Sequence, residues 1–452
     1  MSRLELTHDT ARRVRLWSLA VALAAMMLTS TPTRAAIDGI TGPNFSLTAS
    51  ADYISMPDGA SIYAWGYGIG GLMQLPGPTL IVTAGQTVTV QLRNNLPAAA
   101  GNVSILFPGF QVVASGGVPG LLTREARPGA TVTYVFVASQ PGTYLYHSGT
   151  RPDMQVEMGL YGALIVRPSG SSFANCAYAN AATCFDREYL FLLSELDFNF
   201  HRAVESAASG LGPITVPTEP YLPVYWMING RGAPDTMGMS GTSQLPHQPY
   251  NCMPRMHPGE RILLRVLGAG RQMHPFHTHG NFLQVLARDA RLLVSPTDAT
   301  KLAGPVLFTI PSIPGETVDA IFQWTGKDLG WDIYGHTAAN DPPCRDANGD
   351  GYDDDDAGGN KWEWCADHTK PIPVTLPNIN VVEIGESYSG SPFLGALGSL
   401  PPGGLRLNQS GAYTFMWHSH AEREMTNNDV FPGGMMTMLI IEAPGVLIDE
   451  LH

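Results

Sequence analysis

The nine residues QTVTVQLRN (86–94) alternate apolar and polar side chains, so an extended chain would place Val88, Val90 and Leu92 on one side. A period of two is typical of a β-strand with one face against a core. The same alternation recurs in four further segments: TVTYVFVA (131–138), ERILLRVL (260–267), ETVDAIFQW (316–324) and GMMTMLIIE (434–442). No long segment after residue 36 has the 3.6-residue period of a helix. With 49 Gly and 36 Pro to form turns, this pattern predicts an all-β protein built as sandwiches.

A polar segment with two cysteines, PSGSSFANCAYANAATCFDRE (168–188), divides the chain. We therefore predict a first domain over 37–168, a linker over 169–187 and a second domain over 188–445. The second domain is larger than one sandwich needs. Its excess lies between about residues 326 and 404, which we interpret as a long loop insertion.

Residues 1–36 resemble an export signal, because Arg12, Arg13 and Arg15 directly precede an apolar run, LWSLAVALAAMML (16–28), that is followed by small residues. The paired arginines of ARRVRL (11–16) are shared with twin-arginine signals. The apolar run is too short to span a bilayer, and no later segment is long and apolar enough. We expect a periplasmic or secreted mature chain without a transmembrane segment.

The net charge excludes one class of function, and the spacing of the cysteines predicts two disulfides. The 39 acidic and 26 basic residues give a net charge of −13, which would repel a polyanion and excludes a nucleic-acid-binding role. All five cysteines follow residue 36. In an oxidising compartment their spacing pairs Cys176 with Cys184 and Cys344 with Cys365, and it leaves Cys252 as a buried thiol.

The predicted insertion contains an acidic segment, DANGDGYDDDD (346–356), with Asp346, Asn348 and Asp350 at alternate positions before a glycine. This oxygen-rich spacing is that of a calcium loop. The glutamate expected at the twelfth position is replaced by Ala357. Calcium is therefore a candidate second metal, and a solvated acidic loop is the alternative.

Two His-x-His pairs, in HPFHTHG (274–280) and WHSHAERE (417–424), have the spacing of metal ligands, because alternate residues of a strand project to the same side. A further histidine lies in YHS (146–148) at the end of an alternating segment. Neutral imidazoles bind copper, zinc, iron or nickel. The candidate ligands are His147, His277, His279, His418 and His420.

These motifs resemble those of the multicopper oxidase superfamily. LPGPTLIVTAGQTVTVQLRNNLP (75–97) resembles the opening of its first domain, and GTYLYHSGTRPDMQVEMGLYGALIVRP (142–168) the end of that domain. MHPGERILLRVLGAGRQMHPFHTHGNFLQVLARD (256–289) resembles the region of the third copper motif, and YTFMWHSH (413–420) the fourth. The resemblance implies two cupredoxin-like Greek-key β-sandwich domains, copper as the cofactor and oxidoreductase chemistry.

The third motif begins within the second predicted domain, with no middle domain before it. This order is similar to that of the two-domain oxidases, whose copper cluster forms between the first domain of one chain and the second domain of its neighbour. The resemblance therefore implies a homotrimer, and a monomer is the alternative.

The first two copper motifs are incomplete. At the ligand positions of the first motif the sequence has Leu106 and Pro108, which cannot bind a metal. The second motif keeps His147 but has Gly149 in place of its second histidine. The first domain would thus contribute one imidazole.

The third motif is intact, and the resemblance makes His274 a type 1 ligand, His277 a type 2 ligand and His279 a type 3 ligand. In the fourth motif Ser419 replaces the cysteine and Glu424 the last histidine. A type 1 site needs a thiolate, because the soft Cu–S bond provides its affinity for Cu(I) and its path for electrons. We therefore expect no type 1 site, and we add His274 and Glu424 as further candidate ligands.

The predicted function is that of an exported, multicopper-oxidase-like copper-binding protein with a reduced histidine cluster. It would act as a copper-dependent oxidoreductase on a small-molecule or metal-ion substrate. Three or four imidazoles that converge on one ion would form a mononuclear site, which zinc could also occupy. The alternatives are copper sequestration or delivery without catalysis, and a structural or assembly role with the histidines as hydrogen-bonded core groups.

Overall fold

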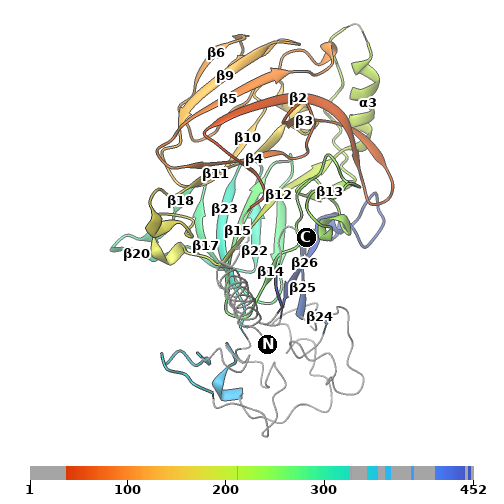
Figure 1. Ribbon diagram of the computed structural model, residues 1–452. Coiled ribbons are helices and arrows are strands. Elements are labelled where there is room, and N and C mark those ends of the chain that lie inside the picture. The colour runs from red at the N-terminus through yellow and green to blue at the C-terminus, as the bar shows by residue number, and fades with distance from the viewer. Residues whose placement is uncertain are drawn as a thin grey trace, which may run out of the picture. The chain divides into compact units, whose positions relative to one another are not determined.

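The computed structural model gives the architecture shown in Figure 1. It describes residues 37–210, 212–325, 327, 344–354, 362–367, 388–390, 413–442 and 446–448. The predicted signal (1–36) and most of the predicted insertion lie outside the described residues. Within the described part of the chain, no helix is long and apolar enough to cross a membrane.

Residues 40–167 form two sheets that share one hydrophobic core. One sheet has the order β3-β2-β5-β9-β6, and the other has the order β1-β4-β11-β10 (Figure 1). The strands are β1 (Ile40–Thr41), β2 (Asn44–Ser55), β3 (Ser61–Gly68), β4 (Gly77–Thr83), β5 (Thr87–Asn94), β6 (Val113–Gly116), β9 (Thr131–Val137), β10 (Gly142–His147) and β11 (Tyr161–Arg167). Val88, Val90 and Leu92 of β5 are fully buried, as their alternation predicts.

Most of the described strands between residues 187 and 441 form two larger sheets. Their orders are β13-β12-β15-β23-β17-β18, with β21 beside β17, and β14-β26-β25-β16-β22, with β24 beside β25. The strands are β12 (Arg187–Leu196), β13 (Tyr225–Ile228), β14 (Arg255–Met256), β15 (Arg261–Gly268), β16 (His274–Thr278), β17 (Leu283–Arg288), β18 (Arg291–Leu292), β21 (Val306–Leu307), β22 (Thr309–Ser312), β23 (Thr317–Gln323), β24 (Tyr388–Gly390), β25 (Tyr413–Ser419) and β26 (Met436–Ile441). Phe191, Phe276 and Trp417 pack edge to face in the core between these sheets.

Four short strands form two ribbons outside the sheets. They are β7 (Val118–Pro119) with β8 (Arg124–Glu125), and β19 (Val294–Ser295) with β20 (Asp298–Leu302). This predominance of strands confirms the all-β prediction. The division into domains at 37–168 and 188–445 stays a prediction, since a third core cluster contains side chains from both halves of the chain, among them Leu145 and Leu192.

The helix α3 (Phe198–Ala208) departs from the expected absence of helical segments, and it packs beside β3 (Figure 1). The Asp197 carboxylate caps it by accepting hydrogen bonds from the backbone N–H groups of Asn199 and Phe200. A second α-helix, α2 (Pro152–Gln155), is a single turn. Eleven residues are enough for α3 because its Phe200 and Val204 join the first core.

Both predicted disulfides form, Cys176 with Cys184 and Cys344 with Cys365. Cys252 is a buried free thiol, also as predicted. Burial raises the pKa of the Cys252 thiol to about 12, so it stays protonated and unreactive at neutral pH.

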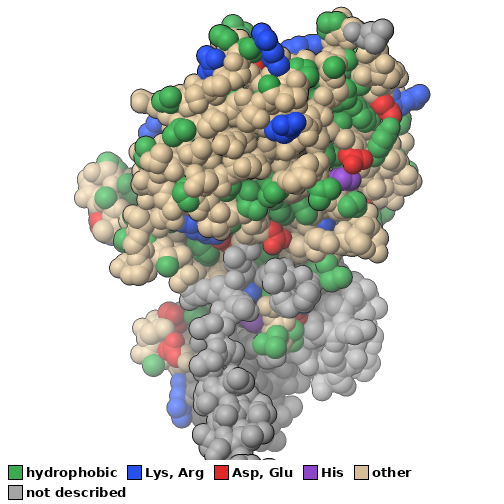
Figure 2. Space-filling view, turned by 45° about the horizontal axis from the view of Figure 1, so that its top comes forward, with side chains coloured by type: hydrophobic (Ala, Val, Ile, Leu, Met, Phe, Trp, Pro, Cys, Tyr) green, Lys and Arg blue, Asp and Glu red, His purple; other side chains and the backbone are tan. Residues whose placement is uncertain are grey.

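A buried ion cluster joins strands from both halves of the chain. Arg265 of β15 forms ion pairs with Glu188 of β12 and Asp319 of β23. Thr143 of β10 accepts a hydrogen bond from Arg265 and donates one to Asp319. Arg167, at the end of β11, pairs with Glu188 from the other side. On the outer surface, by contrast, Lys and Arg side chains are scattered over the face in Figure 2.

Candidate metal centre

Three buried histidines from two neighbouring strands converge on one point. β16 and β25 are antiparallel, and their register places His277 directly opposite His418. His279 lies two residues beyond His277 and therefore on the same side of the sheet. The ligand atoms of His277, His279 and His418 lie within 4.8 Å of one another. The Nε2 atoms of His279 and His418 are 3.2 Å apart.

A fourth candidate, His420, lies at the edge of this group. Its ring centroid is 4.9 Å from that of His277 and 5.5 Å from that of His418. Its side chain is 43% exposed, and its Nδ1 lies 3.1 Å from a carboxylate oxygen of Glu422. The structure therefore brings four of the five predicted histidines together, three of them buried and one at the solvent edge.

Hydrogen bonds to the second ring nitrogen orient His418 and His277, and at His418 they also set the tautomer. His418 Nδ1 donates to the Ser419 carbonyl oxygen at 2.7 Å, which leaves Nε2 as the atom that could bind a metal. His277 Nδ1 lies 2.8 Å from the Thr309 hydroxyl. Burial and the three neighbouring histidines lower the pKa of His279 to about 3. This imidazole is thus neutral at physiological pH, as a metal ligand must be.

His147 ends β10, in the other half of the chain. Its Nδ1 lies 3.0 Å from the carbonyl oxygen of the following residue, Ser148, which repeats the arrangement at His418. Burial lowers the pKa of His147. Among the described residues, the ligand atoms that lie close together are those of His277, His279 and His418. His147 is not part of this group.

The residues at the incomplete first-domain motifs are in contact with one another. Leu106 and His147 form a β-bridge, with the Leu106 N–H donating to the His147 carbonyl at 2.7 Å. A Cβ atom at Gly149 would lie 2.7 Å from Leu106 Cγ. The leucine side chain therefore covers the glycine, and Pro108 is exposed nearby in sequence. Leu106 thus occupies the space that a side chain at position 149 would need.

The other two candidate ligands, His274 and Glu424, lie in a separate buried cluster. His274 Nδ1 is 2.9 Å from Glu424 Oε2, and His274 Nε2 is 2.9 Å from Glu195 Oε2. The Ser419 hydroxyl donates to the same Glu424 oxygen at 2.5 Å. Burial would lower the pKa of His274, but the two carboxylates raise it to about 9. His274 is therefore an imidazolium ion at neutral pH, and both of its nitrogens act as donors.

Sequence reasoning did not identify Glu195. It lies near the end of β12, in which all ten residues are buried. A carboxylate in such an apolar strand is itself a signal, because buried charges need partners.

Residues 57–171 match a family model described as multicopper oxidase. The chain is also similar to copper resistance protein A of Pseudomonas syringae pv. tomato, with 28% identity over 263 residues, 54% of this chain and 42% of that protein. Residues 57–171 therefore carry a multicopper oxidase domain. This match and the similar proteins confirm the resemblance on which the ligand positions were assigned.

Two further similar proteins support the resemblance to multicopper oxidases. L-ascorbate oxidase of Brassica rapa subsp. pekinensis is 32% identical over 169 residues, 35% of this chain and 26% of that enzyme. The solved blue copper oxidase of Nitrosomonas europaea matches with a TM-score of 0.50 at 20% identity, covering 88% of this chain and 85% of that one. This structural likeness supports the cupredoxin-like fold. The chain spans less than half the length of these two curated relatives.

The contact between Leu106 and Gly149 leads to a prediction for the multicopper oxidase fold. Gly149→His should lower the unfolding free energy by about 1–3 kcal/mol, because the new side chain overlaps Leu106. Adding Leu106→Ala should recover at least half of the loss. Urea unfolding measures both variants. Gly212→His is the control, since no atom lies within 4 Å of a Cβ there, and equal losses at 149 and 212 would contradict the steric argument.

The raised pKa of His274 predicts how stability varies with pH. A histidine whose folded pKa exceeds its unfolded value stabilises fully below about pH 6.5 and loses that contribution as the pH rises through about 9. For metal-free protein, the stability difference between wild type and His274→Gln should shrink by about 3 kcal/mol between about pH 6 and 10. Urea unfolding at both pH values tests this. A difference that does not vary with pH would show that His274 is neutral in the folded protein.

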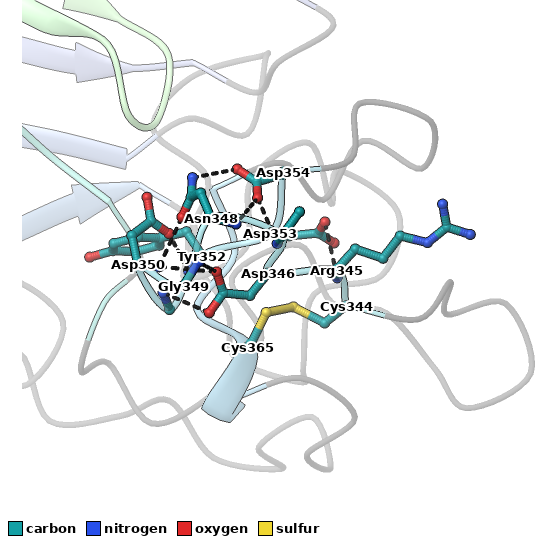
Figure 3. The surroundings of a disulfide bond; sticks show 12 residues. Cys344, Arg345, Asp346, Asn348, Gly349, Asp350, Tyr352, Asp353, Asp354 and Cys365 are labelled. Carbon is teal, nitrogen blue, oxygen red and sulfur yellow. Dashed lines mark hydrogen bonds between the residues drawn. A yellow bond between two sulfur atoms is a disulfide. The ribbon is translucent and has the colours of Figure 1, made fainter.

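The acidic loop is ordered by its own carboxylates. Asp346 accepts hydrogen bonds from the backbone N–H groups of Gly349, Asp350 and Gly351, at 2.6–3.0 Å. Figure 3 shows Asp346, Asn348 and Asp350 beside the disulfide bond that closes this segment. Calcium binding by these three residues stays a prediction, and Ala357 lies outside the described residues.

Proposed function

We propose that this chain is an exported copper protein of the multicopper oxidase superfamily that binds copper through histidines alone, without a type 1 site. The observation that carries the proposal is the convergence of three buried imidazoles within 4.8 Å. Export rests on the signal-like residues 1–36. The absence of a type 1 site rests on Ser419, whose hydroxyl lacks the softness of a thiolate.

The donors fit copper. Neutral imidazoles are ligands for copper and zinc, and the lowered pKa of His279 keeps it unprotonated. His277, His279 and His418 would hold the ion, with His420 at the solvent edge as a fourth ligand. A bound copper ion would supply one-electron redox chemistry at a place where a substrate can approach from the side of His420. The protein residues orient the imidazoles through Thr309 and the Ser419 carbonyl.

We further propose a homotrimer in which His147 of a neighbouring copy completes the site. Two features support this assembly. His147 has the same backbone anchor as His418 although it lies in the other half of the chain. Exposed aromatic side chains border the histidines: Phe308 is 51% exposed with its ring 5.4 Å from that of His277, and Phe282 packs against it. An apolar border of this kind suits a subunit contact.

The first experiment is the metal content of the exported protein, with visible and electron paramagnetic resonance spectra of the same sample. We expect about one copper per chain, no intense blue colour and a tetragonal Cu(II) signal. Zinc in place of copper, or no metal, would overturn the proposal. Oxidation of a phenolic or metal-ion substrate then distinguishes an oxidoreductase, whose turnover depends on His279 and His418, from a protein that only sequesters or delivers copper.

A second metal is proposed for the acidic loop. If Asp346, Asn348 and Asp350 bind calcium, then calcium at about 100 times its dissociation constant should stabilise the protein by about 2.7 kcal/mol. Asp350→Ala should remove this effect, and Asp298→Ala, at the start of the short strand β20, should keep it. Thermal unfolding with calcium and with a chelator measures both. Equal unfolding temperatures in the two conditions for wild type would leave a solvated loop as the explanation.

A further inference from the structure

The three positions that the resemblance assigns to type 1 ligands, His274, Ser419 and Glu424, lie in a buried cluster that also contains Glu195. We infer that this cluster, called here the acidic clamp, takes the structural place of type 1 copper and positions the histidines of the proposed copper site. The inference rests on the proposed function for its consequences, but the clamp itself is a property of the metal-free chain.

The acidic clamp joins segments that are far apart in sequence. Glu195 comes from β12, His274 begins β16 and Ser419 ends β25. Glu424 lies in the short helix η6 (Glu422–Met425) that follows β25. A metal with ligands at these positions would cross-link the same segments. Ion pairs and hydrogen bonds perform this task here.

The polar groups at the centre of the clamp all have partners. His274 contacts one carboxylate through each ring nitrogen, both at 2.9 Å. The second oxygen of Glu195 accepts from the backbone N–H groups of Arg271 and Gln272, at 2.6 and 2.9 Å. Glu195 therefore also fixes the turn that leads into β16. A buried ion pair contributes to order only when it is hydrogen-bonded in this way.

Ser419 transmits the clamp to the histidines. It lies between His418 and His420, so its side chain projects to the opposite face of the strand, where it donates to Glu424. Its carbonyl oxygen accepts a hydrogen bond from His418 Nδ1, and its backbone N–H donates to the carbonyl oxygen of Met435. The hydrogen bond from the Ser419 hydroxyl to Glu424 fixes the position of this residue, and therefore also of the Ser419 carbonyl that sets the His418 tautomer. Ser419 and Glu424 are thus positioning residues.

The test uses Glu424→Gln, which keeps the shape of the side chain and removes its charge. Outer partners of metal ligands usually change affinity by about 10–100-fold. We expect at least about tenfold weaker Cu(II) binding in competition with a chelator, together with an altered paramagnetic resonance signal. Ser419→Ala, which removes only the hydroxyl, is the second variant if the first does not fold. Unchanged affinity and spectrum in a folded variant would overturn the clamp.

Glu188→Gln is the matched control, because Glu188 is a buried carboxylate in the Arg265 cluster. It should lower stability and change Cu(II) affinity by no more than about twofold. A tenfold loss there would show that general destabilisation, rather than the clamp, weakens binding.

A crystal structure of each metal-free protein separates the two proposals. If wild type binds no Cu(II), the copper proposal fails, and the ring orientations of His418 and His420 still test the clamp. Rings that turn in Glu424→Gln but keep their orientation in Glu188→Gln support positioning. Rings that stay in place in both variants overturn it.

Discussion

Replacing both His279 and His418 by alanine is expected to abolish copper binding. Their Nε2 atoms are 3.2 Å apart, and both belong to the only three-histidine group that the described part of the chain forms. Loss of an outer partner of a ligand already weakens metal sites by about 10–100-fold, so loss of two ligands should cost more than about 100-fold in Cu(II) affinity. Isothermal titration and metal analysis after dialysis measure this directly.

His247→Ala is the control for this experiment. His247 is a histidine that contacts Asp52 and the Met73 carbonyl, so removing it should leave the copper content unchanged. Copper retained in the double variant, or lost equally from both proteins, would place the metal elsewhere. Single alanine variants show whether two imidazoles suffice.

Arg265→Met should be the most destabilising single substitution among those considered. Arg265 is fully buried between Glu188 and Asp319. Burial would raise the pKa of Glu188, but the Arg265 and Arg167 guanidinium groups hold it below its ordinary range. Removing one partner from a buried ion pair leaves an uncompensated charge and costs about 3–5 kcal/mol. Urea unfolding at neutral pH gives the value.

Arg288→Met is the matched control for the buried cluster. Arg288 ends β17, which lies two strands from β15 in the same sheet, and it is about one-third exposed and pairs with Glu316 at 2.7 Å. A surface pair of this kind is worth about 1 kcal/mol or less. If Arg265→Met and Arg288→Met lose equal amounts of unfolding free energy, the buried ion cluster contributes no more to stability than a surface ion pair. A replacement of all the charges by apolar groups is a separate question, because such redesigned cores can be as stable as the original.

The period of two predicts the strands because alternate side chains of a strand point to opposite faces, and one face is buried in the core. In β5 and β9 the apolar residues of each alternation face the core. The helix α3 was not predicted, since it has only eleven residues and only Phe200, His201 and Val204 among them are buried, too few for a clear 3.6-residue period. Its start is fixed by Asp197, a local signal that periodicity does not measure.

The candidate site was only partly predictable for a similar reason. His277 and His279, like His418 and His420, are close in sequence, so strand geometry alone places each pair on one face. Their union depends on the pairing of β16 with β25, which the family resemblance implied and residue spacing could not show. Glu195 is 79 residues from His274, and no local pattern connects them.

The contact of Leu106 with Gly149 has a consequence for the history of this chain. A mutation that restores a histidine at position 149 alone would meet the leucine, and one that restores a histidine at 106 alone would still lack its partner. The step at 149 would complete a His-x-His pair with His147 but carries a cost in stability, and the step at 106 alone forms no pair because position 108 is proline. The order of the two changes therefore matters, because replacing Leu106 first removes the overlap that a histidine at 149 would otherwise meet.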